Sequence, residues 1–356
     1  MNKNQFYELK ISKVRQLTDQ SVALSFTVPD ELKSVFTFIP GQYLTLRAAI
    51  EAEDTRRSYS ICSSQNSDLL EVGIKQVPDG VFSNFASRLK AGDYLSVMPP
   101  QGRFTAQTGG SHSYLLIAAG SGITPCLSII SSVLESETES NITLVYGNRS
   151  TADIMFRDAL NALKDRFTER LQVFHVLSRE VQDIDLTNGR IDGKKITQFN
   201  DANLFSPNQM DAAYICGPED MIKSVSESLL ELGMDTNVVH FELFTTENSA
   251  KKHREIPIQE LEESTSITIT LDGTTRQFGL DAEHETVLAA AQRAGLDLPF
   301  SCEGGMCCTC RCKIVSGDSK MNVNYSLQDW EVEAGYTLAC QTRPTSKNLV
   351  LDFDDT

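Results

Sequence analysis

Five of the nine cysteines lie within eleven residues, from Cys302 to Cys312. No other stretch constrains the chain as strongly, because thiols so close together act as ligands of an iron–sulfur cluster, as ligands of zinc or as disulfide partners. The opening stretch MNKNQFYELK lacks the apolar segment of a signal peptide, so we expect a cytoplasmic protein. In that reducing compartment, clustered cysteines are metal ligands more often than disulfide partners.

The spacing of four cysteines favours a [2Fe–2S] cluster. Cys302, Cys307 and Cys310 follow the pattern C-x4-C-x2-C, and 29 residues separate Cys310 from Cys340. Plant-type iron–sulfur proteins have this spacing. A structural zinc site usually takes two close pairs of ligands, and Cys340 has no cysteine near it in the sequence. Zinc therefore stays as the weaker alternative, and the expected compartment disfavours disulfides.

The C-terminal part, residues 265–356, resembles a plant-type ferredoxin in this cysteine pattern. The resemblance implies an α+β domain of the β-grasp fold, in which these four cysteines are the cluster ligands. Cys308 and Cys312 are then ordinary side chains beside the cluster, with Cys308 kept open as a substitute ligand. Most ferredoxins of this kind carry Gly, Ser or Ala at the position of Cys308.

The charge and hydropathy of the chain exclude two classes of partner. The net charge of −16 would repel the phosphates of a nucleic acid, so we expect no such partner. Residues 113–134 carry no charge, but Gly-Ser-Gly and Thr-Pro interrupt them. This stretch therefore predicts a buried strand, a tight turn and a helix, and we expect no membrane span.

The periodicity of the chain divides it into segments. Short alternating strands with one short helix predict a small antiparallel β-barrel over residues 1–107. Apolar strands alternate with helical stretches over residues 108–244, which predicts βαβ units and a parallel sheet, an α/β nucleotide domain. Residues 245–264 have few apolar side chains and predict a linker. Residues 265–356 begin with a hairpin that has Asp-Gly at its turn.

The tetrapeptide RSYS, Arg57–Ser60, resembles the flavin-binding signature of the ferredoxin–NADP reductase family. Its chemistry suits a flavin, because it offers a guanidinium for phosphate, an aromatic ring for the isoalloxazine and a hydroxyl near the reactive nitrogen. A helix that opens at Gly80 favours FAD over FMN, because its N-terminus suits a pyrophosphate. The resemblance implies that FAD is bound by Arg57, Ser58, Tyr59, Ser60, Ile74, Lys75, Gly80, Phe82 and Ser83.

Two glycine-containing motifs follow in the α/β segment. The motif GSGITP, Gly120–Pro125, ends a strand and begins a helix, and resembles the family's loop for the pyrophosphate of a nicotinamide nucleotide. A bare glycine-rich loop is a structural turn more often than not. The motif CGP, Cys216–Pro218, resembles the place where the family's thiol lies by the nicotinamide, with a buried core cysteine as the alternative. The resemblance implies nucleotide contacts from Gly120, Gly122, Thr124, Pro125, Cys216, Gly217 and Pro218.

Two further places concern the choice of nucleotide and the transfer of hydride. Arg149 and Ser150 follow the strand end where the family reads the adenosine ribose, and they favour NADPH over NADH because they can bind a 2′-phosphate. Glu242 and Phe244 match the end of the family's reductase module near the flavin, although an ordinary edge strand would look the same. The resemblance implies three catalytic residues, Ser60, Cys216 and Glu242.

The order of the three segments resembles the reductase component of multicomponent oxygenases, of the phenylacetyl-CoA epoxidase type. A nicotinamide gives up two electrons together and a [2Fe–2S] cluster accepts one at a time, so a flavin has to lie between them. We therefore expect an NAD(P)H oxidoreductase with FAD and a [2Fe–2S] cluster that reduces a diiron oxygenase. The alternatives are a reductase of a steroid hydroxylase, a fatty-acyl desaturase or the hybrid-cluster protein, and a redox sensor.

Overall fold

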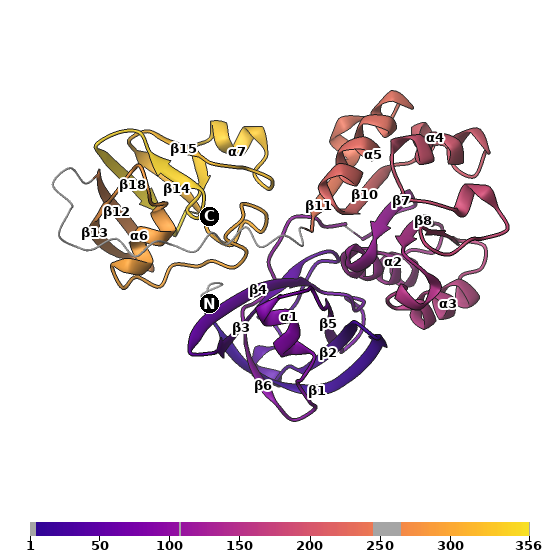
Figure 1. Cartoon of the computed structure of the whole chain (residues 1–356), viewed down its shortest axis with the longest axis horizontal. Coiled ribbons are helices and arrows are strands. Elements are labelled where there is room, and N and C mark those ends of the chain that lie inside the picture. Colours follow the sequence, from indigo (N-terminus) through magenta and orange to yellow (C-terminus); the bar gives the residue numbers. More distant parts are fainter. Residues whose placement is uncertain (1–4, 107, 245–264, 356) are drawn as a thin grey trace. The chain divides into compact units, whose positions relative to one another are not determined.

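Short strands with inward-facing apolar side chains build the N-terminal part of the protein in the computed structural model, which describes residues 5–106, 108–244 and 265–355 (Figure 1). One six-stranded sheet has the order β4-β3-β6-β1-β2-β5, and every pairing is antiparallel. A bridge between Ile61 and Val72 joins the β4 and β5 edges and closes the sheet into the predicted barrel. The strands are β1 (Tyr7–Thr18), β2 (Ser21–Thr27), β3 (Tyr43–Ile50), β4 (Glu53–Ser60), β5 (Leu70–Lys75) and β6 (Tyr94–Val97).

The barrel core consists of every second residue of its strands, because side chains alternate between the two faces of a strand. On β2, Val22, Leu24 and Phe26 are buried in this core. Helix α1 (Val81–Ala86) follows β5 and adds Phe82, which is almost fully buried, to the same core. The start of the helix thus lies against the barrel, where the sequence predicted it.

A parallel sheet follows, with the strand order β11-β10-β7-β8-β9. The chain runs outward from β7 to β9 and then returns to β10 on the other side of β7, so the strand order switches between β7 and β10. Ligands of α/β sheets bind at such a switch, beyond the carboxyl ends of the strands. The strands are β7 (Ser113–Ala119), β8 (Asn141–Asn148), β9 (Leu171–Leu177), β10 (Ala212–Gly217) and β11 (Val239–Leu243).

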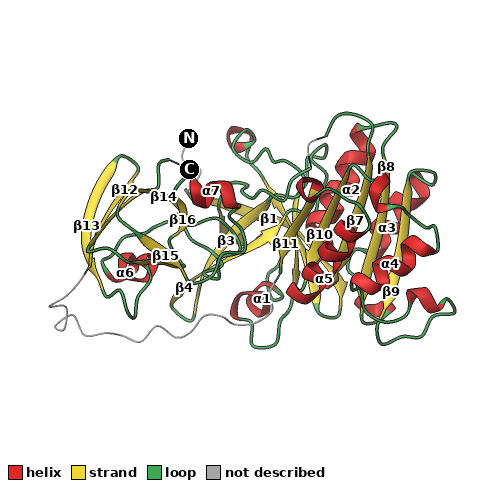
Figure 2. Ribbon diagram, turned by 90° about the horizontal axis from the view of Figure 1, so that it is seen from above, coloured by secondary structure: helices red, strands yellow, loops and turns green. Residues whose placement is uncertain are grey.

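Helices cover both faces of this sheet (Figure 2). Leu116 of β7 packs in one core with apolar residues of α2, whereas Leu115 packs in the opposite core with residues of α5. The uncharged stretch of residues 113–134 is thus strand, turn and buried helix, as predicted, and no helix in the described part of the chain is long and apolar enough to cross a membrane. The helices are α2 (Ile123–Ser136), α3 (Arg157–Arg166), α4 (Gly193–Asp201) and α5 (Glu219–Glu231).

The C-terminal residues form a separate unit, which the structure describes from residue 265 on. Its main sheet has the order β13-β12-β18-β14-β16, with one parallel pair, β12 and β18, and helix α6 packed on it. This is the α+β arrangement that the sequence predicted. The elements are β12 (Thr265–Leu271), β13 (Thr274–Leu280), α6 (Val287–Arg293), β14 (Arg311–Ser316), β15 (Ser319–Met321), α7 (Asp329–Glu333), β16 (Tyr336–Leu338), β17 (Thr342–Pro344) and β18 (Asn348–Asp352).

The hairpin between β12 and β13 turns at Asp272 and Gly273, whose φ angles are 52° and 69°. Two successive positive φ angles are typical of the tight hairpin turn that Asp-Gly favours. The predicted linker, residues 245–264, lies outside the described residues, as does residue 107. The domain boundaries at these places therefore stay predictions.

Candidate flavin, nucleotide and cluster sites

The three predicted catalytic residues come together although they lie on three different strands. The Ser60 hydroxyl at the end of β4 donates a hydrogen bond to Glu242 Oε2 on β11 (3.2 Å). Glu242 is in turn the direct neighbour of Cys216 in the parallel pairing of β10 and β11. Ser60 and Cys216 are both almost fully buried, whereas Glu242 is half-buried.

The flavin motif lies along β4, next to helix α1. The Tyr59 ring packs against the Phe82 ring with centroids 5.7 Å apart, and burial raises the pKa of Tyr59. Ser83 is already engaged, because its hydroxyl accepts from the Val77 amide (3.2 Å) and donates to the Gly80 carbonyl (3.4 Å). The hydroxyl of Ser83 thus holds the turn before α1, and its contact with FAD stays a prediction.

Lys75 lies at the boundary between the barrel and the parallel sheet. A Cβ atom on Gly120 would be 3.7 Å from Lys75 Nζ, so the ammonium group lies against the glycine-rich loop. Burial lowers the pKa of Lys75, nearby Asp153 opposes that shift, and Arg149 adds to it. Lys75 was predicted to bind FAD, but its ammonium group also faces the loop that is predicted to bind the nucleotide.

The glycine-rich loop is hydrogen-bonded to Tyr146 and packed against the CGP motif. The Tyr146 hydroxyl donates to the Gly120 carbonyl (2.9 Å), and Gly120 has a positive φ of 56°. A Cβ atom on Gly122 would lie 2.2 Å from the Cys216 carbonyl oxygen and 3.2 Å from its Sγ. The GSGITP and CGP motifs therefore touch at the switch between β7 and β10. Burial raises the pKa of the Cys216 thiol well above its usual value, which keeps it neutral.

Ser150, one of the two residues predicted to bind a 2′-phosphate, already makes hydrogen bonds within the protein. The Ser150 hydroxyl donates to Asp153 Oδ2 (2.7 Å), which also accepts from the Ser150 amide (3.1 Å). Glu180 accepts from the hydroxyl and the amide of Thr151 (2.6 and 2.7 Å). Two carboxylates thus hold the donors that follow β8. A 2′-phosphate would have to displace Asp153 to reach Ser150, which leaves Arg149 as the predicted reader that can pair with it directly.

The motifs did not single out Asn148, the last residue of β8. Asn148 is only 8% exposed, and its side chain lies beside the hydroxyl of the buried Tyr146, which holds the glycine-rich loop. The sequence signal that could have identified Asn148 was a polar residue at the carboxyl end of a predicted strand, where ligands of α/β sheets bind. Asn148 therefore joins the predicted nucleotide-binding residues.

The four predicted cluster ligands lie in two pairs. Cys302 and Cys307 are hydrogen-bonded to each other, and so are Cys310 and Cys340. The hydrogen bond from Cys302 lowers the pKa of Cys307 to about 6. Two irons with two thiolates each suit this pairing, because a [2Fe–2S] cluster takes four cysteines.

The loop between the ligands wraps closely around the sulfur atoms. The amides of Gly304 and Met306 both donate to Cys302 Sγ (3.4 Å each). Such amides stabilise thiolates beside a metal. Cys308 has a positive φ of 53°, and Cys312 is fully buried in the core of this unit. None of the nine cysteines forms a disulfide, so that alternative is not realised.

Models of three protein families match the chain in succession. The oxidoreductase FAD-binding domain matches residues 8–106, the oxidoreductase NAD-binding domain matches residues 116–227, and the 2Fe-2S iron-sulfur cluster binding domain matches residues 269–345. These matches confirm the predicted order of the three domains and their cofactor classes.

Relatives of known function match along nearly the whole chain. The chain is 42% identical to the E subunit of 1,2-phenylacetyl-CoA epoxidase from Escherichia coli (strain K12), over 98% of both chains. It is 32% identical to the ferredoxin reductase component of 3-ketosteroid-9-alpha-monooxygenase from Rhodococcus rhodochrous, over 97% of this chain and 96% of that one. Among solved structures, phthalate dioxygenase reductase has a TM-score of 0.61 at 24% identity, over 98% of both chains, and shows the same fold.

We expect Gly122→Ala to raise the KM for NAD(P)H about tenfold in ferricyanide reduction. The new methyl group would collide with the Cys216 backbone and push the glycine-rich loop away from β10, at a cost of about 1–3 kcal/mol. Ser121→Ala, in the same loop, adds no atom beside Cys216 and is the matched control. An unchanged KM in Gly122→Ala with normal FAD content would show that the nucleotide binds elsewhere.

We expect Cys340→Ser to abolish the cluster and Cys308→Ser to retain it, because Cys340 is a predicted ligand that is paired with Cys310, whereas Cys308 lies outside the predicted ligand set. Iron and acid-labile sulfide are measured in anaerobically prepared protein, together with the visible circular dichroism of the cluster. Loss of iron in Cys308→Ser would contradict the ligand assignment, and zinc in place of iron would contradict the cluster itself.

Proposed function

The chain belongs to the family of reductases that join an FAD-binding, an NAD-binding and a 2Fe-2S domain and pass electrons to oxygenases, and on this basis we propose that it reduces the oxygenase component of a phenylacetyl-CoA epoxidase. The identity to one component of that epoxidase, along almost the full length of both chains, carries the proposal. The reductases of 3-ketosteroid-9-alpha-monooxygenase also match at full length but are less similar, and they define the second candidate.

The bound cofactors supply the redox chemistry, since a flavin takes two electrons from a nicotinamide and releases them singly to a [2Fe–2S] cluster. The residues of this chain bind and orient these groups. Ser60 and Glu242 join the barrel to β11, and the neutral Cys216 lies beside the glycine-rich loop. The burial of Ser60 and Cys216 would limit the access of water to a transferred hydride.

We propose a diiron oxygenase as the acceptor and the cytoplasm as the location. Plant-type clusters have potentials near about −400 mV, low enough to reduce a diiron centre. The nine cysteines form no disulfide, which supports a reducing compartment, where disulfides are rare.

The cluster unit carries an exposed apolar segment that supports electron delivery to a separate protein. Four exposed apolar side chains lie within residues 323–332, and Trp330, the only tryptophan of the chain, is 57% exposed. The segment contacts the ligand loop, because the Tyr325 amide and the Ser326 hydroxyl both donate to the Gly305 carbonyl (3.2 and 3.1 Å). Exposed apolar patches of this kind mark protein interfaces. The exposed residues are Val323, Tyr325, Trp330 and Val332.

Reconstitution tests the proposed acceptor. With NAD(P)H, the full chain should support turnover of phenylacetyl-CoA by the epoxidase's oxygenase component. Trp330→Ala should raise the KM for that component several-fold without changing the rate of ferricyanide reduction. Val315→Ala, which removes another exposed apolar side chain of the same unit, is the control. Faster turnover with the oxygenase of a 3-ketosteroid-9-alpha-monooxygenase would favour the second candidate instead.

We expect Arg149→Ala to lower kcat/KM for NADPH about ten- to a hundredfold and to change that for NADH little. A charge-assisted contact to the 2′-phosphate is worth about 1.5–3 kcal/mol, and NADH has no such phosphate. Steady-state kinetics with both nucleotides and ferricyanide measure the difference. Equal losses for NADPH and NADH would show that Arg149 does not read the 2′-phosphate.

A further inference from the structure

We propose that a set of hydrogen bonds between residues 63–66 of the barrel and one face of helix α2, here called the α2 clamp, sets the position of the nicotinamide relative to the flavin. The inference rests on the proposed function only in that the chain oxidises NAD(P)H with FAD. It does not depend on which oxygenase receives the electrons. The residues of the clamp belong to none of the motifs described above.

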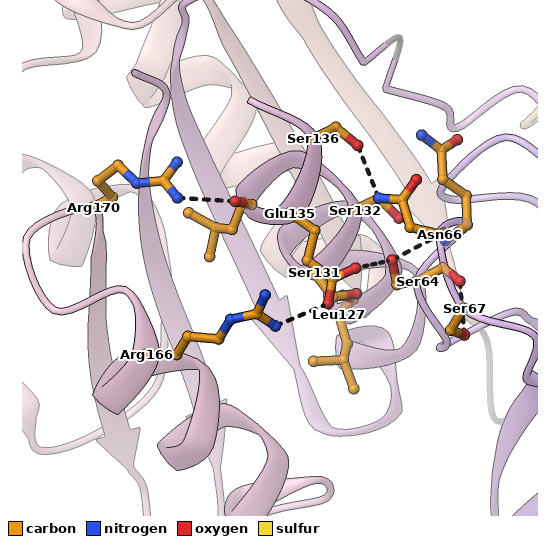
Figure 3. A network of polar contacts seen from close by, with 12 residues as sticks. Ser64, Asn66, Ser67, Leu127, Ser131, Ser132, Glu135, Ser136, Arg166 and Arg170 are labelled. Atoms are coloured by element: carbon orange, nitrogen blue, oxygen red, sulfur yellow. Dashed lines mark hydrogen bonds and ion pairs between the residues drawn. The ribbon is translucent and has the colours of Figure 1, made fainter. Parts of the chain in front are cut away.

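The clamp joins four consecutive residues of the segment between β4 and β5 to four residues of α2 that lie on one helix face. Figure 3 labels Ser64 and Asn66 on the barrel side and Ser132, Glu135 and Ser136 on the helix side. Its hydrogen bonds run from Ser128 Oγ to Ser63 O (2.8 Å), from Ser64 Oγ to Glu135 Oε2 (2.5 Å), from the Gln65 amide to Ser132 Oγ (3.0 Å) and from Asn66 Nδ2 to Ser136 Oγ (2.8 Å).

The inner part of the clamp is closed to water. Ser128 and Ser132 are fully buried, and Ser63 and Ser64 are each 8% exposed. A buried polar group that loses its partner costs about 1–3 kcal/mol. A shift of α2 along or about its axis would break several of these bonds at once without replacement by water, so the clamp holds the helix in one register on the barrel.

Both sides of the clamp continue directly into cofactor motifs. The barrel side follows the flavin motif, which ends at Ser60, and the helix side follows the glycine-rich loop, which ends at Gly122. At the same boundary, a Cβ atom on Gly73 of β5 would lie 2.8 Å from atoms of both Thr124 and Phe156, so the backbone of β5 packs closely against the start of α2. The clamp therefore ties the flavin strand to the nucleotide loop.

The far end of α2 is braced within the nucleotide domain. Arg166 forms an ion pair with Glu135 (3.5 Å), and Arg170 donates to the Leu134 carbonyl (2.9 Å), contacts that Figure 3 also draws. The C-terminal half of α2 thus carries both the clamp and this brace, and a rigid helix transmits a displacement there to its first turn. Transfer between two reacting atoms depends steeply on their separation, so a displacement of about 1 Å can cost a hundredfold in rate.

Two neighbouring serines of α2 provide a matched test. The Ser132 hydroxyl accepts across the boundary from Gln65, whereas the Ser131 hydroxyl donates to Leu127 O in its own helix (2.7 Å). We expect Ser132→Ala in the full chain to slow flavin reduction by NAD(P)H about tenfold in stopped-flow absorbance. Ser131→Ala should not slow it, and Ser132→Thr, which keeps a hydroxyl, should restore most of the rate.

Four further measurements separate positioning from folding. FAD content and the Kd for 2′,5′-ADP should stay unchanged in Ser132→Ala, while the charge-transfer absorbance of the reduced protein with NADP⁺ should weaken. Hydrogen exchange should rise in residues 61–67 and at the start of α2, a readout that needs no nucleotide. If Ser132→Ala fails to fold, Asn66→Ala, at the exposed end of the clamp, replaces it.

The proposal is overturned if the clamp variant reduces its flavin as fast as Ser131→Ala, or if its slower reduction follows loss of FAD alone. A failure of the unaltered chain to reduce its flavin with NAD(P)H would instead contradict the proposed function. In that case equal hydrogen-exchange rates of residues 61–67 in Ser132→Ala and Ser131→Ala would still overturn the proposal about the clamp.

Discussion

The close approach of Gly122 to the backbone of Cys216 governs the first unit, because only a residue without a side chain fits there. This contact joins the loop after β7 to the end of β10 at the point where the strand order switches. Helix α2 starts from the same loop, and its face with Ser128 and Ser132 lies on the barrel. The positions of the flavin motif, the glycine-rich loop and β11 all follow from it.

Burial shifts the pKa values of two groups at the boundary between the barrel and the parallel sheet. The Cys216 thiol is kept neutral, because burial raises its pKa, and the pKa of Lys75 is lowered for the same reason. Ser60 and Glu242 satisfy each other across the boundary. A neutral thiol and a partly desolvated cation thus lie at the glycine-rich loop, which is predicted to bind an anionic nucleotide.

The C-terminal unit, which matches the 2Fe-2S domain, has to hold a metal cluster close to the protein surface. Backbone amides donate to the sulfur of Cys302. Strand β14, which directly follows the predicted ligand Cys310, begins with Arg311, and Arg311 forms an ion pair with the fully buried Glu331 (2.8 Å). A buried ion pair needs both partners, because removal of one leaves an unpaired charge. Through Glu331 this pair fixes helix α7, from which Trp330 projects into solvent.

The sequence by itself determined the alternation of strands and helices, the spacing of the four cysteines and the motifs at Arg57–Ser60 and Gly120–Pro125. Each is a local pattern, and local geometry follows directly from periodicity and from glycine positions. Only the tertiary structure decided that Ser150 is held by Asp153, that the Asn148 side chain is buried beside Tyr146 and that the thiols lie in two pairs. The α2 clamp is also visible only in the tertiary structure, since Ser64 and Glu135 are 71 residues apart and no sequence pattern around a serine predicts its hydrogen-bond partner.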